Sequence, residues 1–199
     1  PAQLINPINE HEPLLRGSLF KSLFSAVNTN VKKGHSAIKA FEVGNVFFKS
    51  KSSFKQELHL SGIIHHHEAP TSWSNRKFSY DFYSLKGEIL RLLKTAGVQD
   101  IQFKQTASCI PFNKNALEIF EGKTKIGIFG EVDLALTEKL IKKSALGFEI
   151  YPEKILFHTK QNKMKSTSKF PLSAKDMNVI VNKSHTYSEI ENTLTKGKI

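Results

Sequence analysis

Apolar residues dominate both faces of a strand-like stretch at residues 37–48, AIKAFEVGNVFF, the most sheet-like run in the chain. Successive side chains of a strand point to opposite faces, so Phe41 and Val43 share one face while Ile38 and Ala40 share the other. Gly44 and the residue after it mark a bend or a bulge. Because apolar residues on both faces are typical of a strand covered on both sides, the pattern predicts a central strand.

Glu42 interrupts this apolar pattern between Phe41 and Val43. A buried carboxylate without a partner is too costly to keep, so Glu42 needs a counter-charge or belongs to a site. Arg16, which also lies inside an apolar run, is the nearest upstream candidate. We therefore predict a structural Arg16–Glu42 ion pair that braces the strand against the preceding segment.

Periodicity predicts the remaining elements. Apolar residues at spacings of three and four predict helices that begin at Ser18, at Tyr80 with Asp81 in the first turn, and after Asp133. Alternation and turn residues predict strands at 57–65, 101–105, 116–120, 125–132 and 147–151, with the 57–65 strand antiparallel to the first. Beyond these, a strand is expected at 175–181, followed by a helix opened by the capping box of Thr186 and Glu189.

Three glycines within these elements carry expectations of close packing. Gly87 lies in the middle of a predicted helix, where it is expected to approach a strand. Gly127 and Gly130 lie in one predicted strand, where they are expected to admit another backbone or side chain. Together the elements predict an α+β fold, an antiparallel sheet flanked by helices.

A change in composition divides the chain. Lysines without any acidic residue fill 154–175, so residues 1–157 are predicted to form the main domain, 158–167 a basic linker, and 168–199 the beginning of a further domain. Four lysines of this region, Lys160, Lys163, Lys165 and Lys169, are candidates for contact with RNA phosphates. The alternative is a solvated basic connector.

Composition and charge limit the class of protein. The 199 residues are 39% hydrophobic, with no apolar run of membrane-spanning length and no signal peptide, and the net charge of +11 favours an anionic partner such as nucleic acid. The single cysteine, Cys109, excludes an internal disulfide and fits a reducing cytoplasm, so a cytoplasmic protein is expected.

Neither the histidines nor the cysteine predicts catalytic chemistry. His59 and His65–His67 invite a metal site, but consecutive strand residues point to opposite faces and no cysteine or patterned carboxylate completes the ligand set. Cys109 has no evident base beside it. The sequence carries no phosphate-binding loop, zinc-protease motif or nucleophile elbow. We expect no catalytic residue and no metal.

Several motifs in a fixed order resemble a known family. They are Phe41-Glu42-Val43-Gly44, Asp81-Phe82-Tyr83, Gly130-Glu131, Phe148-Glu149 and Ser168-Lys169-Phe170-Pro171. Together they resemble the C-terminal part of the β subunit of bacterial phenylalanyl-tRNA synthetase. The resemblance implies a non-catalytic core like that of class II aminoacyl-tRNA synthetases, followed by the start of a ferredoxin-like anticodon-binding domain.

The resemblance also implies partners and cofactors. The chain would be a subunit-interface part of a ligase that attaches phenylalanine to its tRNA, with a catalytic α subunit in an α2β2 heterotetramer and no membrane. ATP and Mg²⁺ would serve the holoenzyme and none would bind this fragment, since active cores carry Arg in Phe-Arg-x-Glu where this chain has Ala40. The alternative is an autonomous basic RNA-binding module.

Overall fold

The computed structural model describes residues 14–35, 37–50, 53–65, 80–106, 110–133, 145–155 and 176–196. The chain divides into two compact units, Pro1–Lys160 and Gln161–Ile199, and each is described by itself. The expected helix at 134–143, Cys109, His66, His67 and the four candidate lysines lie outside the described residues. Among the described residues, no helix is long and apolar enough to cross a membrane.

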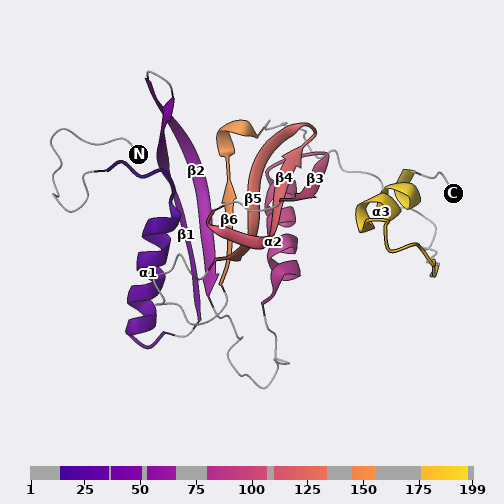
Figure 1. The fold of residues 1–199 in the computed structure, drawn as a ribbon, viewed down its shortest axis with the longest axis horizontal. Helices are drawn as coiled ribbons and strands as arrows, with labels where there is room; N and C mark the ends of the chain where they lie inside the picture. Colours follow the sequence, from indigo (N-terminus) through magenta and orange to yellow (C-terminus); the bar gives the residue numbers. More distant parts are fainter. Residues whose placement is uncertain are drawn as a thin grey trace, which may run out of the picture. The chain divides into compact units, whose positions relative to one another are not determined.

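A six-stranded antiparallel sheet forms the centre of the first unit (Figure 1). Its strands are β1 (Ile38–Ser50), β2 (Ser53–His65), β3 (Ile101–Gln105), β4 (Phe112–Glu121), β5 (Thr124–Val132) and β6 (Ala145–Ile150). They are ordered β1-β2-β6-β5-β4-β3. The five expected strands of this unit after the first one are all confirmed, as is the antiparallel pairing of β1 with β2.

Glycines in the sheet show where backbones or side chains approach closely. A Cβ on Gly130 would lie 2.5 Å from the Asn115 carbonyl oxygen, and one on Gly127 would lie 2.7 Å from the Glu149 carbonyl oxygen. The expectation of close approach is therefore confirmed for both. It is wrong for Gly87, where nothing lies within 4 Å of an added Cβ. Gly87 lies on the exposed side of its helix, away from the buried stripe of Leu85, Ile89 and Leu93.

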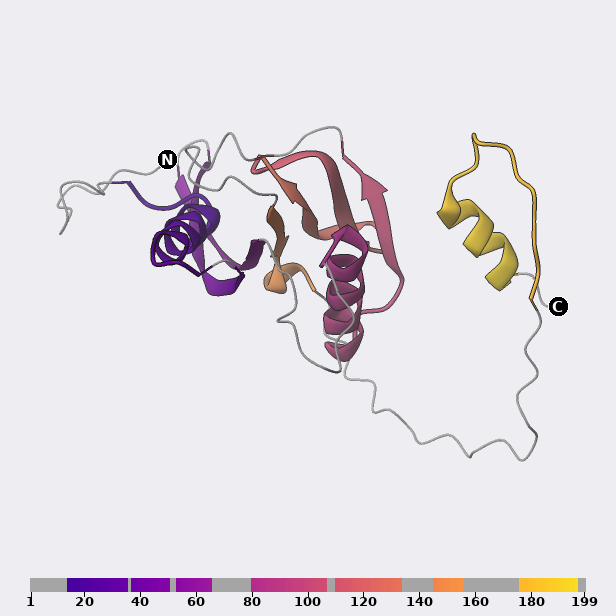
Figure 2. The same cartoon turned by 90° about the horizontal axis from the view of Figure 1, so that it is seen from below.

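Helix α1 (Phe20–Lys32) covers one face of the sheet at the β1–β2 end (Figure 2). Its buried side chains are Phe20, Leu23 and Val27, which pack with Ile38, Ile63 and Ile128 from the strands. The helix begins two residues after the predicted start, although Ser18 Oγ still accepts a hydrogen bond from the Phe20 amide at 3.2 Å. This face also carries the side chains of Ala40 and Glu42.

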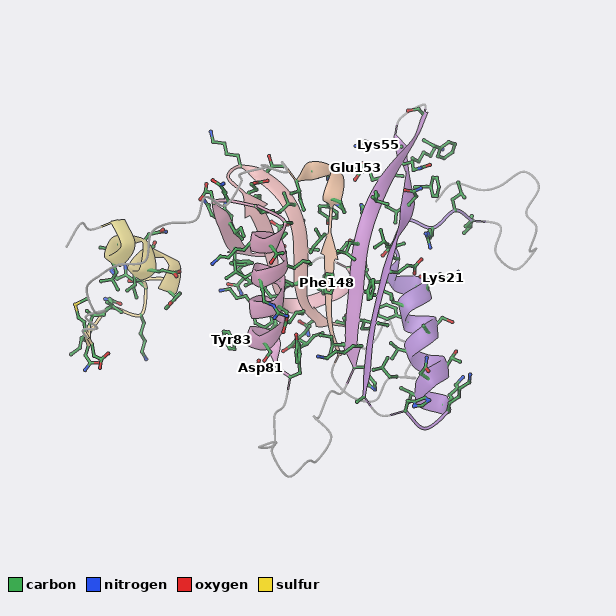
Figure 3. The ribbon with its side chains drawn as sticks, turned by 180° about the vertical axis from the view of Figure 1, so that it is seen from behind. Lys21, Lys55, Asp81, Tyr83, Phe148 and Glu153 are labelled. Carbon is green, nitrogen blue, oxygen red and sulfur yellow. The ribbon has the colours of Figure 1, made fainter. Side chains whose placement is uncertain are left out.

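Helix α2 (Phe82–Thr95) packs on the opposite face and lies in front of the strands in Figure 3. Asp81 caps it by accepting from the Ser84 amide at 2.8 Å. Its apolar stripe, Leu85, Ile89 and Leu93, packs with Ile119, Phe129 and Ile150. The two faces follow from alternation along β2, since Ile63 packs in the α1 cluster while Leu60 and Ile64 pack against the α2 cluster.

The prediction that residues 37–48 form a central strand is wrong, because β1 is an edge strand. Phe41 is 75% exposed and Val43 is 55% exposed. An apolar pattern indicates which residues favour burial. It does not indicate whether the surface that buries them belongs to the same chain. The order of strands in the sheet, which decides this, is set by distant residues.

The second unit contains helix α3 (Tyr187–Lys196). The capping box is confirmed: the Thr186 amide donates to Glu189 Oε2 at 2.8 Å, and the Glu189 amide donates to Thr186 Oγ1 at 3.4 Å. The predicted strand at 175–181 is wrong over its described residues 176–181, which form no regular secondary structure. A strand needs a neighbouring strand, and the described part of this unit supplies none.

Candidate functional site

Strand β1 is the element on which the candidate site is built. Its two sides differ because neighbouring residues face opposite ways. Ala40 and Glu42 face α1, whereas Phe41 and Val43 face the side that α2 covers farther along the sheet. One strand therefore presents a closed, partly polar side and an open, apolar side.

The structure brings together Arg16 and Glu42, the predicted ion pair. Arg16 Nη1 donates to Glu42 Oε1, and the hydroxyl of Ser22 on α1 donates to Glu42 Oε2. Arg16 Nε also donates to the Asn45 carbonyl oxygen at 2.8 Å. Arg16 and Ser22 thus tie β1 to the segment before it and to α1, and sequence reasoning had not anticipated the hydroxyl.

Gly44 makes room for this arrangement. A Cβ at Gly44 would lie 2.2 Å from Arg16 Nη2, so a side chain there would displace the guanidinium. The Phe47 amide donates to the Arg16 carbonyl oxygen at 2.9 Å, which fixes the Arg16 backbone alongside β1. Arg16 is therefore held by its side chain and its main chain at one end of the strand edge.

A second polar cluster lies on β2 and β6. His59 and Ser61 are buried and bind the same carboxylate oxygen, Glu149 Oε1, at 3.0 Å from His59 Nδ1 and 3.2 Å from Ser61 Oγ. His59 Nε2 lies 3.6 Å from a carboxylate oxygen of Glu57. The hydrogen bond from Lys55 holds the pKa of Glu57 below its usual value, so this carboxylate is ionised at neutral pH.

This cluster is organised for structure and not for nucleophilic catalysis. A nucleophile must contact its general base, yet Ser61 and His59 each contact Glu149 and no contact joins them. Ser61 is also fully buried, so no substrate reaches it. Among the described residues, no group of three or more histidine, cysteine, aspartate or glutamate side chains is arranged to hold a metal ion.

A pocket of about 370 Å³ lies beside the start of α2. Its lining includes Tyr83, which is labelled in Figure 3, together with Phe82, Gln105, Asn115 and Glu131. The Glu131 carboxylate is held by the side-chain amides of Asn113 and Asn115, at 3.0 and 3.1 Å. The described lining offers no nucleophile and no cationic group for phosphate.

The sequence is related to known proteins along nearly its whole length. A family model described as the phenylalanyl tRNA synthetase beta chain CLM domain matches residues 1–151. The chain belongs to this family. The resemblance found in the motifs of the sequence is thereby confirmed.

Three relatives show how much sequence this chain shares with known proteins, and each is named phenylalanine–tRNA ligase beta subunit. The Protochlamydia amoebophila protein is 26% identical over 198 residues, which cover 98% of this chain and 25% of the relative. The Wigglesworthia glossinidia protein is 30% identical over 91% of this chain and 23% of the relative. The Thermotoga maritima protein is 28% identical over 92% of this chain and 23% of the relative. The chain thus spans about a quarter of the length of these relatives.

A solved structure supports the fold of this CLM-domain chain. Pyrrolysyl tRNA synthetase from Desulfitobacterium hafniense aligns with a TM-score of 0.52 and 15% identity, covering 69% of this chain and 47% of that chain. The α+β architecture expected from the sequence, an antiparallel sheet flanked by helices, is therefore confirmed and is shared with an aminoacyl-tRNA synthetase.

Proposed function

We propose that this chain is a non-catalytic, subunit-interface part of the β subunit of a phenylalanine–tRNA ligase. It supports a catalytic α subunit that attaches phenylalanine to its tRNA, within a cytoplasmic α2β2 heterotetramer. ATP and Mg²⁺ act at the level of the holoenzyme. The family match over residues 1–151 and the relatives' shared name support this assignment.

The non-catalytic role is supported by the residues that β1 places beneath α1. Active cores of the class II synthetases carry an ATP-binding arginine in Phe-Arg-x-Glu at the position of Ala40, and Ala40 packs instead against the apolar cluster formed with α1. Glu42, two residues on, is tied to Arg16 and Ser22. Arginine is the side chain that binds phosphate in a bidentate manner. The residues present do not fit ATP, and no step of the ligase reaction is assigned to them.

The second unit supports the further proposal that residues 168–199 begin a ferredoxin-like domain that packs on tRNA. Met177, Val179 and Ile180 are each at least half exposed. Apolar side chains in such numbers need additional elements to cover them, as a complete ferredoxin-like domain would provide. The candidate lysines Lys160, Lys163, Lys165 and Lys169 remain proposed tRNA contacts.

Co-expression with the α subunit of a phenylalanine–tRNA ligase tests the main proposal. We expect the β subunit that contains this chain to co-elute with α at the size of an α2β2 complex. A β subunit that elutes apart from α would contradict the proposal. Ala40→Arg tests the non-catalytic role, because an arginine beneath α1 should lower the melting temperature without producing ATP-dependent stabilisation.

The net charge of +11 favours a second candidate function, an autonomous RNA-binding module. The two functions differ in what they require. An autonomous module binds tRNA without α, with an affinity that falls steeply as salt rises, whereas an interface domain binds tRNA tightly only within the complex. Titration of labelled tRNA at two salt concentrations, with and without α, separates them.

A further inference from the structure

The outer edge of β1 carries backbone groups that β2 does not use. In an antiparallel strand, the N–H and C=O groups of alternate residues point toward the neighbouring strand and those between point away. The Phe47 amide and the Asn45 carbonyl both bond to Arg16, which lies outside the sheet. The continuous register of β1 against β2 then points the backbone groups of Lys39, Phe41 and Val43 outward as well.

Arg16 closes only one end of this edge. Its side chain and main chain bind at Asn45 and Phe47. Within the described part of the chain, no backbone partner is seen for the outward groups of Lys39, Phe41 and Val43. The open edge is therefore the five-residue stretch 39–43, which we call the β1 edge segment.

The side chains of the β1 edge segment are also open. Phe41 and Val43 are 75% and 55% exposed on one face. Phe148, labelled in Figure 3, adds an aromatic ring to this face, since a Cβ on Gly62 would lie 2.4 Å from its ring and Gly62 pairs with Phe41. Natural edge strands are normally blunted by proline, bulges or charged side chains. Residues 39–43 contain no proline and no bulge, and their two charges are Lys39 at the start of the segment and Glu42 on the other face. The apolar part of this edge, at Phe41 and Val43, is therefore a site for the addition of another strand.

Charge indicates which kind of strand fits. Glu42 is the only carboxylate of β1, and Arg16 and Ser22 hold it on the other face. Lys39 lies at the start of the edge segment, with its ammonium 4.2 Å from the centre of the Tyr80 ring. On α1, exposed Lys21 precedes Ser22, which binds Glu42. A second copy of the chain would bring the same cations and another charge of +11 to this edge. An apolar strand with acidic residues is the complementary occupant.

We propose that an extended, acidic–apolar segment of the catalytic α subunit adds to the β1 edge segment as a seventh strand. This inference rests on the proposed function and specifies its interface. Main-chain hydrogen bonds to Lys39, Phe41 and Val43 would supply affinity, and the side chains of Phe41 and Val43 would supply apolar contact. A carboxylate of the added strand would meet Lys39.

Amide hydrogen exchange resolved to single residues tests the added strand directly. In the α–β complex, the amides of Lys39, Phe41 and Val43 should exchange at least about tenfold more slowly than in β alone. The amides of Ala40 and Glu42 already bond to β2 and should change little. A partner that merely packs on the face of the sheet would not give this alternation, so uniform or absent protection overturns the inference.

Three substitutions in the full β subunit test the same segment by its affinity for α. Val43→Pro removes an outward N–H while the β2 pairing stays intact, and Phe41→Glu removes apolar contact; each should weaken binding about tenfold or more. Phe54→Glu, at a 60% exposed aromatic residue near the β1–β2 turn, is the matched control and should bind normally. Circular dichroism establishes that each variant is folded.

The outcomes separate this inference from the proposed function. If wild-type β binds α and both edge variants bind as well as the Phe54 variant, the added strand is refuted and the interface function stands. If wild-type β does not bind α, the proposed function is refuted, and the added strand of α is refuted with it. If the alternating protection arises in β alone and grows with its concentration, the occupant is a second copy, and the assignment to α is overturned.

Discussion

Glu149 is the acceptor on which the buried polar cluster of β2 and β6 depends. Its side chain is 12% exposed, and that of His59, whose Nδ1 lies 3.0 Å from Glu149 Oε1, is 5% exposed. Ser61 is fully buried and donates at 3.2 Å. Replacing Glu149 with alanine leaves both buried groups without this partner.

The magnitude follows from the number of groups left unsatisfied. A buried polar group that loses its hydrogen-bond partner costs about 1–3 kcal/mol. Two such groups predict that Glu149→Ala lowers the free energy of unfolding by about 2–6 kcal/mol. Glu149→Gln keeps one oxygen acceptor in place, so its cost should be about 1 kcal/mol.

Urea denaturation of the three proteins, followed by circular dichroism, measures these differences. Glu118→Ala is the matched control, because Glu118 lies on neighbouring β4 and its partner is a single lysine, Lys125, at 2.6 Å. Both side chains are a quarter to a third exposed, so this pair contributes about 0–1 kcal/mol. A cost for Glu149→Ala no larger than that of Glu118→Ala would refute the reasoning.

Two further predictions concern the glycines and the cap of α2. Gly87→Ala should raise the free energy of unfolding by about 0.5–1 kcal/mol, since the added Cβ meets open space in a helix. Gly130→Ala should lower it by more than about 1 kcal/mol, because the added Cβ would clash with the Asn115 carbonyl oxygen. Thermal denaturation of both variants shows whether each change stabilises or destabilises the protein. Hydrogen bonds from Ser84 lower the pKa of Asp81, so its stabilising effect holds above the unfolded pKa of about 3.9 and is lost as pH falls through the folded pKa. The advantage of wild type over Asp81→Asn in melting temperature should therefore shrink below about pH 4.

Local rules predicted most elements of the fold. The apolar stripe of α2 and the Asp81 cap act within a few residues of each other, and so they are readable from sequence. The same holds for the Thr186–Glu189 capping box. The edge position of β1 depends on the order of six strands, which no local pattern encodes. Residues 176–181 were predicted to form a strand and do not, because an alternating pattern alone cannot supply the partner strand that a strand needs.

The candidate site was predictable only where chemistry demanded a partner. Glu42 stood out as a lone carboxylate in an apolar strand, and this pointed to Arg16. Glu149 had the same Phe-Glu-aliphatic setting, but its partner His59 lies 90 positions away in the sequence. Phe41 and Val43 were predicted to be covered, because apolar composition alone does not distinguish an exposed edge strand from a buried strand.

The alternation of β1 gives this strand two separable tasks. Ile38, Ala40 and Glu42 face α1, where packing and hydrogen bonds bind the strand to its own domain, so changes there should lower stability. Phe41 and Val43 face solvent and contribute little to the stability of the isolated domain, so changes there should spare stability and reduce binding to α. Ala40 packs against the apolar cluster beneath α1, as the proposed non-catalytic role requires. The opposite side of the same strand carries the exposed Phe41 and Val43, where the proposed seventh strand would add.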